Sequence, residues 1–164
     1  MDLEQAKETF INAWGSLGSS WGINKVMGQI HALLLVSTEP LSTDQIMEEL
    51  HISRGNVNMN IRALMDWGIA EKVYVKGERK EYFTSKKDIM ELARQVTRER
   101  RKRELEPILK VLDQVQQLDD DSKEAKEFKK VTKELTLFSK KADTVLEKFA
   151  KSDKNWFFKM ILKL

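Results

Sequence analysis

The sequence has no cysteine, only two prolines and only seven glycines among its 164 residues. Without cysteine there are no disulfides, no thiolate zinc sites and no cysteine nucleophile, and the chain is compatible with a reducing compartment. So little proline and glycine argues against a disordered chain or several domains joined by linkers. We expect one ordered domain, or a small domain with a helical extension, stabilised by packing.

Long hydrophobic runs are also missing. The longest stretch, Ala32 to Val36, is far short of the roughly 20 residues that span a bilayer. The start carries acids at Asp2 and Glu4 and lacks the basic start and apolar run of a signal peptide. We therefore expect a cytoplasmic protein without a membrane partner. One alternative is a short interfacial membrane helix at residues 156–164, where two lysines lie among aromatic and aliphatic residues.

Groups that carry enzyme chemistry are scarce. The two histidines are His31, in an apolar segment, and His51, in a predicted turn, and neither belongs to an HExxH-like motif. A glycine-rich phosphate-binding loop is absent as well. The sequence therefore predicts no enzyme, no metal site and no cofactor, and both histidines are interpreted as structural.

Positive charge is modest overall but unevenly distributed. The net charge is +3 and the pI is about 9.0, which permits a nucleic-acid partner without requiring one. Residues 41–103 hold 14 lysines and arginines against 10 acids. The basic run from Arg98 to Arg103 suits phosphate contacts, but a solvated helix face paired with Glu104 and Glu106 is the favoured interpretation.

Hydrophobic periodicity predicts four helices in the first 67 residues. The first runs from Leu3 to about Leu17, where glycines and serines loosen the pattern, and the second covers about 23–36. Ser42 to Gln45 forms a potential capping box for a short third helix that ends at His51-Ile52. Ser53 is a potential cap for a fourth helix, to about Trp67. Two helices joined by such a short turn are typical of a helix-turn-helix unit.

The following segment changes to strand-type residues. Ile69, Val73 and Val75 precede the glycine-bearing turn 76–79, and Tyr82 and Phe83 follow it. This pattern predicts a β-hairpin, which after a helix-turn-helix unit is the position of a wing.

Two long helices are predicted in the last part of the chain. Ser85 to Asp88 resembles a cap for a helix through Val115 with a kink at Pro107, and the polar break 119–122 starts a second helix to about Phe149. Their apolar stripes have no domain of their own to cover, so we expect a homodimer. A two-fold dimer presents two recognition helices to half-sites roughly 34 to 36 Å apart.

The fourth helix has an unusual polar face. Its apolar stripe is Val57, Ile61, Leu64 and Met65, and no lysine or glutamate lies between residues 54 and 65. Arginine and asparagine bond guanine and adenine edges, and small residues permit close approach. We expect base contacts from Asn56, Asn60 and Arg54. The alternative is that these are incidental polar residues of a protein-binding helix.

The hairpin turn adds three cationic side chains, those of Lys76, Arg79 and Lys80. In a wing, such side chains contact phosphates or enter a minor groove. Charged hairpin tips are, however, often simply solvated. The candidate DNA-binding residues are Ser53, Arg54, Gly55, Asn56, Asn58, Met59, Asn60, Arg62, Lys76, Arg79 and Lys80.

Three segments occur in order that carry a family resemblance: 53–62, 66–69 and 77–83, with sequences SRGNVNMNIR, DWGI and GERKEYF. Over about residues 14–115 the chain resembles the glycine-betaine-synthesis-repressor (GbsR-like) branch of the MarR superfamily. The resemblance implies a dimeric repressor or activator, with the helix after Ser53 as recognition helix and residues 77–80 at the wing tip. It also implies dimerisation through terminal helices and, in some relatives, a response to choline.

The sequence thus predicts a mainly α fold with a small β-hairpin wing. The expected divisions are an N-terminal helix in the dimer interface (1–22), a winged helix-turn-helix domain (23–86) and a helical dimerisation region (87–164). The sequence predicts a transcription regulator that binds double-stranded DNA and acts as a repressor. The alternative is a winged-helix protein-interaction module.

The four tryptophans are Trp14, Trp21, Trp67 and Trp156. Together they would suit a cage for a choline-like effector, held by cation–π attraction, although tryptophans at helical spacing are more often core residues.

Overall fold

The computed structural model describes residues 1–152 and Lys159. The predicted terminal segment 156–164, including Trp156, lies outside the described residues apart from Lys159. The chain forms two compact units, Met1–Leu92 and Ala93–Leu164.

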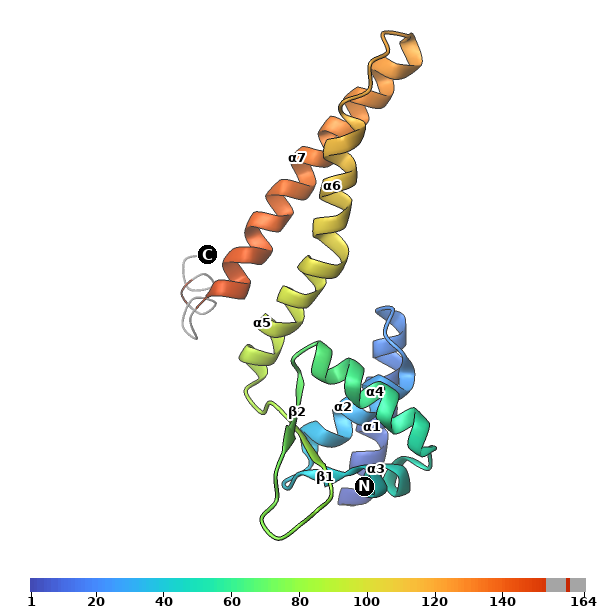
Figure 1. Cartoon of the computed structure of the whole chain (residues 1–164), viewed down its shortest axis with the longest axis vertical. Helices are drawn as coiled ribbons and strands as arrows, with labels where there is room; N and C mark the ends of the chain where they lie inside the picture. Colours follow the sequence, from blue (N-terminus) through green and yellow to red (C-terminus); the bar gives the residue numbers. More distant parts are fainter. Residues whose placement is uncertain (153–158, 160–164) are drawn as a thin grey trace. The chain divides into compact units, whose positions relative to one another are not determined.

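The first unit is a helical cluster with a small sheet (Figure 1). The three strands are β1 (Leu41–Ser42), β2 (Ala70–Val73) and β3 (Tyr82–Ser85). They are antiparallel in the order β1-β3-β2, with Leu41 opposite Phe83 and Val73 opposite Tyr82. The predicted hairpin is confirmed as β2 and β3, whereas β1 has two residues, too few to show any periodicity. In chain order the elements are α1 (Leu3–Ser20), α2 (Lys25–Val36), β1 (Leu41–Ser42), α3 (Thr43–Leu50), α4 (Arg54–Asp66), β2 (Ala70–Val73) and β3 (Tyr82–Ser85).

The predicted helix starts at Ser42 and Ser53 are confirmed. The Ser42 Oγ accepts from the backbone N–H of Gln45 at 3.3 Å, and the Gln45 side chain accepts from the Ser42 N–H at 2.8 Å. Ser53 caps α4 by accepting from the backbone N–H of Asn56. Between them, His51 ends α3 in the left-handed conformation at φ 52°. This residue turns the chain from α3 into α4.

The glycines that loosen the predicted pattern, Gly15 and Gly18, lie inside the first helix and do not interrupt it. α1 continues through Gly15 and Gly18 to Ser20 because α2 packs closely against it there. A Cβ on Gly28 of α2 would lie 3.0 Å from the Gly15 Cα and 3.3 Å from the Trp14 carbonyl oxygen. The two glycines therefore mark a close approach of two helices rather than a break.

The core of the first unit joins α2, α3, α4 and the sheet. Residues from each helix are almost completely inaccessible, and Phe83 covers them from β3. The largest fully buried side chains are Ile30, Leu34, Ile46, Val57 and Leu64. Burial of α4 through Val57 and Leu64 fixes which of its faces remains exposed.

The second unit is dominated by a helical hairpin. α5 (Ile89–Arg100) starts in the first unit and continues as the π-helical turn η1 (Arg101–Leu105) and α6 (Glu106–Val115). α7 (Lys123–Lys151) returns alongside α6 (Figure 1). The predicted helix start within 119–122 is confirmed: Ser122 caps α7 by accepting from the Ala125 N–H at 3.1 Å.

Two details of the long helix go beyond the prediction, which placed the cap within 85–88 and a kink at Pro107. The cap of α5 is Asp88, whose carboxylate accepts from the Met90 and Glu91 N–H groups, while Ser85 ends β3 and donates to the Ile69 carbonyl. Near Pro107 the helix widens into a π-turn, in which the Glu106 N–H bonds to the Arg101 carbonyl. Proline has no N–H for an α-helical bond, and a wider turn accommodates its ring.

Candidate nucleic-acid interface

The exposed face of α4 carries the side chains expected of a recognition helix. Arg54, Gly55, Asn58, Met59 and Arg62 are all exposed, and Met59 is exposed to 57%. Their spacing of three and four places them on one side of the helix, opposite the buried Val57, Ile61 and Leu64. An exposed methionine among arginine and asparagine offers both apolar and hydrogen-bonding contacts.

Asn60 is a correction to the predicted site. Its side chain is only 3% exposed, and its Nδ2 donates to the Asn56 carbonyl oxygen at 2.8 Å. The residue lies one helical turn before Leu64, so it joins the stripe that packs into the core. In this structure Asn60 therefore cannot present its amide to a base, and its role is structural.

Asn56 and Gly55 lie in the first turn of α4. Asn56 is partly buried and its N–H is held by the Ser53 hydroxyl. A Cβ added to Gly55 would meet nothing within 4 Å. Packing within the domain therefore does not require glycine at this position.

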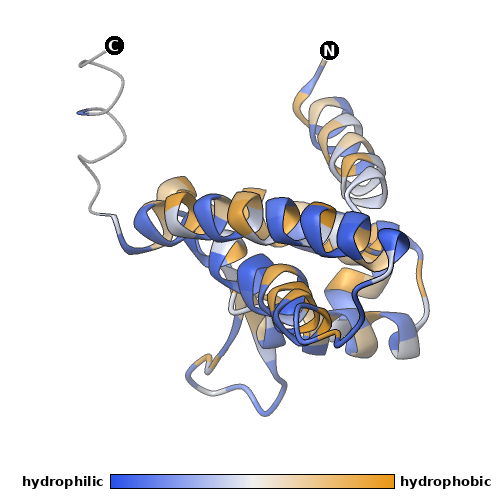
Figure 2. Ribbon diagram, turned by 90° about the horizontal axis from the view of Figure 1, so that it is seen from above, coloured by the Kyte–Doolittle hydropathy of each residue, from blue (hydrophilic) through white to orange (hydrophobic). Residues whose placement is uncertain are grey.

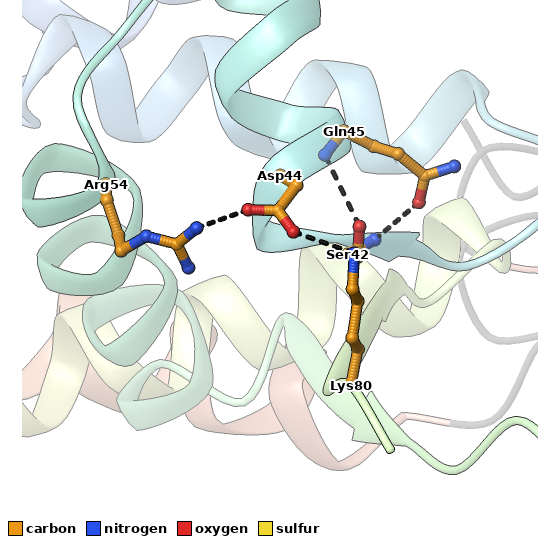
Figure 3. Close-up of polar contacts among 5 residues, drawn as sticks. All are labelled: Ser42, Asp44, Gln45, Arg54 and Lys80. Carbon is orange, nitrogen blue, oxygen red and sulfur yellow. Dashed lines mark hydrogen bonds and ion pairs between the residues drawn. The ribbon is translucent and has the colours of Figure 1, made fainter. Parts of the chain in front are cut away.

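Asp44 connects α3 to both the recognition helix and the wing (Figure 3). One carboxylate oxygen pairs with the Arg54 guanidinium, and the other accepts from the Lys80 Nζ at 2.9 Å. The hydrogen bonds from Lys80 and Arg54 hold the pKa of this carboxyl below its usual range. Sequence reasoning missed Asp44 because its partners lie 10 and 36 residues away.

The wing is an exposed loop between β2 and β3 that projects from the helices (Figure 1). Lys76 and Arg79 are exposed near its turn, where Gly77 adopts a positive φ of 86° that glycine allows without strain. Lys72 at the base pairs with Glu81 and lies over the Tyr74 ring. The wing thus keeps its cations at the tip accessible.

The recognition helix and the wing border one common hollow. Its volume is about 300 Å³, and its lining includes Asp44, Arg54, Asn58, Arg79 and Lys80. Two predicted groups of DNA-binding residues, 26 positions apart from Arg54 to Lys80, are therefore brought together on one surface.

The basic run 98–103 is engaged largely within the second unit. Arg101 makes a bidentate bond to Asp143, and Arg98 donates to the Ala150 carbonyl at 2.9 Å. Arg100 pairs with Glu104, and Arg103 with Glu99. These contacts favour the interpretation of a paired helix face over a phosphate-binding segment.

The three tryptophans that the structure describes lie in α1 or at the ends of α1 and α4. Trp14 contacts Phe10 and His31, Trp21 is exposed at the end of α1, and Trp67 ends α4. Over residues 1–152, no helix combines the length and apolar character needed to cross a membrane.

Comparisons with known proteins agree with this geometry. The model of the family described as "Bacterial regulatory protein, arsR family" matches residues 28–72, from α2 to β2. In Bacillus subtilis (strain 168), YvaV and the HTH-type transcriptional repressor GbsR are each 26% identical over 86 residues, which is 52% of this chain. These residues are 49% of YvaV and 47% of GbsR. The chain thus spans about half the length of the curated relatives it matches.

A solved structure extends the likeness beyond the helix-turn-helix segment. A protein described as "Crystal Structure of a transcriptional regulator" has a TM-score of 0.69 and 20% sequence identity. The match covers 88% of this chain and 95% of that one, so it supports the fold through most of the helical region. The chain therefore has a winged helix-turn-helix fold, and its helix-turn-helix segment is similar to those of bacterial transcriptional regulators.

Proposed function

We propose that the protein is a sequence-specific regulator of transcription that binds double-stranded DNA as a homodimer. The observation that carries this proposal is the exposed α4 face beside the wing cations, on one surface around a common hollow. α4 has no lysine or acid between residues 54 and 65. This composition suits hydrogen bonding to base edges better than simple solvation.

Each part of the surface has a distinct proposed role. Asn58, Met59 and Arg62 read base edges from the middle of α4, and Asn56 supports them from its first turn. Ser53 and Arg54 lie at the start of α4, the part of a recognition helix that approaches base edges in the major groove. Lys76, Arg79 and Lys80 contact phosphates or the minor groove from the wing. Gly55 permits close approach of the helix to the duplex.

The homodimer proposal is supported by an uncovered stripe on α7. Phe128, Val131, Leu135, Phe138 and Val145 follow one another at spacings of three, four or seven and are all exposed. The face of α7 that packs within the chain carries small or polar residues instead, including Ala125, Thr132 and Thr136. Hydrophobic and hydrophilic residues alternate along the ribbons of the helical hairpin formed by α6 and α7 (Figure 2). A heptad-like stripe of large apolar residues is typical of a helix that packs against another subunit.

We further propose that the protein belongs to the GbsR-like branch of the MarR superfamily and acts as a repressor. The support is the partial match to GbsR, which is named as a repressor. The exposed ring of Trp21 is one candidate contact for a choline-like effector. Calorimetric titration with choline tests this, because absence of both binding heat and any change in DNA affinity would rule the effector out.

The experiment for DNA binding starts from the purified full chain. Duplexes selected from a random library, and a scrambled version of the winner, are compared by fluorescence anisotropy at two salt concentrations. We expect tight, salt-sensitive binding of two subunits to the selected duplex. Arg79→Ala should weaken binding to all duplexes and lower the salt slope by about one.

A winged-helix protein-interaction module is the alternative function. It is supported by the exposed apolar side chains, among them Met59 and Phe138. A protein-binding surface releases no condensed counterions from DNA, so it predicts no salt-dependent duplex binding. Failure of the selection to enrich any sequence, with no affinity for random duplex, would favour this module.

A further inference from the structure

Asp44 neutralises part of the surface that the proposed function assigns to DNA. Its two oxygens are taken up by cations from two different elements, Arg54 at the start of α4 and Lys80 after the wing turn (Figure 3). All three side chains are largely open to solvent, with exposures of 45% for Asp44, 60% for Arg54 and 61% for Lys80. The pairs are thus accessible to a competing phosphate.

The cap of α3 does not depend on Asp44. Ser42 and Gln45 form the complete capping box, and they satisfy the backbone N–H groups of Gln45 and Ser42. An acid in the first helical turn interacts favourably with the helix dipole, but that contribution is small and is shared by any acid there. The position of Asp44 between two cations therefore needs another explanation.

A carboxylate beside DNA has opposite effects on the affinity for non-specific DNA, which binds in a loose complex, and on the affinity for a specific site, which binds in a close complex. In a loose, non-specific complex the affinity comes from cations meeting phosphates, and a nearby carboxylate repels the phosphates and occupies two of those cations. In a close, specific complex the Arg54 side chain must have a defined direction, and a paired carboxylate limits its rotamers. A single carboxylate thus lowers the affinity for non-specific DNA while it supports the affinity for the specific site.

We propose that Asp44 is a specificity-determining positioning residue, which holds Arg54 and Lys80 in place and suppresses binding to non-cognate DNA. This inference rests on the proposed DNA-binding function. The lowered pKa of its carboxyl agrees with a residue that stays charged beside the two cations. Asp44 itself makes no contact with a base in this mechanism. It acts through the orientation and availability of its partners.

The test compares Asp44→Asn with the wild type on a selected duplex and on random duplex, across a salt series. We expect affinity for random DNA to rise about threefold to tenfold and the salt slope to steepen by about one, because two cations become available. Affinity for the selected duplex should change less, so the ratio between the two affinities falls at least about threefold. Asp44→Glu, which keeps the charge, should restore most of the ratio.

Glu48→Gln is the matched control. Glu48 is an exposed acid on the same helix, and its substitution changes the net charge by the same amount. A ratio that falls equally in both variants would show a general charge effect and overturn the inference. Circular dichroism and thermal unfolding verify the fold, and Asp44→Ser provides a second neutral variant at the same position.

A double-mutant cycle with Lys80→Ala supplies a second, independent readout. In the wild type the ion pair with Asp44 makes Lys80 less available to phosphates. Lys80→Ala should therefore weaken binding to random DNA more in the Asp44→Asn background than in the wild type. Equal losses in both backgrounds would overturn the inference. If the wild type binds the selected duplex selectively and Asp44→Asn has the same ratio of selected to random affinity, the role proposed for Asp44 is wrong and the proposed DNA-binding function stands. Absence of any DNA binding by the wild type would instead remove the proposed function, and this inference with it.

Discussion

Trp14 donates its indole Nε1–H to Nδ1 of His31 at 3.2 Å, across the contact between α1 and α2. His31 is buried, and because its Nδ1 accepts this bond, the proton of the neutral ring lies on Nε2. Nε2 has no hydrogen-bond partner among residues 1–152. Burial, helped by the charge of Lys87, lowers the pKa of His31 to about 4.

The lowered pKa predicts that the domain loses stability in mild acid. Between the ordinary value of 6.5 and about 4, the unfolded chain binds a proton that the folded chain does not, so the free energy of unfolding falls as the pH falls. From pH 7.5 to pH 5 the loss should be about 2 kcal/mol. Urea unfolding at both pH values measures it.

His31→Gln is the control for this prediction. Glutamine can accept from Trp14 but does not titrate, so the difference between pH 7.5 and pH 5 should become much smaller. The acids with lowered pKa values, such as Asp44, lose their contribution only at lower pH. An equally large loss in the variant would assign the acid sensitivity to other groups.

Gly28→Ala should destabilise the first unit by about 1 to 3 kcal/mol, because the new methyl group meets backbone atoms of α1 at 3.0 and 3.3 Å. Gly18→Ala is the matched control in the same helix pair. Its Cβ would lie 3.5 Å from Ile23 Cδ1, an ordinary contact, so stability should stay equal or rise. Thermal unfolding of both variants measures the difference, and equal melting temperatures would contradict the close-packing argument.

These glycines illustrate where the sequence is insufficient for the fold. Local signals located the caps at Ser42 and Ser53 and the helix start within 119–122, since a cap depends on residues within four positions. The continuation of α1 past Gly15 depends on a tertiary contact with Gly28, which no local pattern contains. Strand β1 was missed for a similar reason, because two residues gain their strand character only by pairing with β3.

The candidate site shows the same division. Helical periodicity identified the buried Val57, Ile61 and Leu64, and so the exposed face opposite them. Asn60 lies at the edge of that stripe, where periodicity alone does not decide between core and surface, and the structure assigns it to the core. The link from Asp44 to Lys80 spans 36 residues and depends on how the wing folds back beside α3.

Asn58→Ala and Asn60→Ala should have different consequences. Asn58 is exposed on the α4 face, so its removal should relax base preference at one position at a cost of about 1 to 3 kcal/mol in specific binding. Asn60→Ala removes a buried hydrogen bond and should lower stability by about 1 kcal/mol. Binding-site selection with each folded variant measures the preference, and a changed preference in Asn60→Ala would reverse the two assignments.

Gly55→Ala should separate stability from function. The added Cβ meets no atom of the domain, and alanine is the better helix former, so the free energy of unfolding should rise by up to about 1 kcal/mol. On DNA the same methyl group enters the space that we assign to the duplex, so affinity should fall. Thermal unfolding and anisotropy measure the two effects. A stabilised variant with unchanged affinity would show that this turn of α4 does not approach DNA closely.

The α7 stripe gives a prediction for the proposed dimer with an internal control. Leu135 lies in the stripe, between Val131 and Phe138, whereas Leu137 lies off it, and the two leucines are exposed to similar extents, 49% and 54%. A charge buried against a partner subunit is costly, and a two-fold interface contains each substitution twice. Leu135→Glu should therefore weaken dimerisation at least about 100-fold, while Leu137→Glu should leave it nearly unchanged. Sedimentation equilibrium measures both constants. If both variants dimerise as tightly as the wild type, the interface lies elsewhere. If both variants are monomers, a charge anywhere on α7 is enough to prevent dimerisation, and the stripe has no special role.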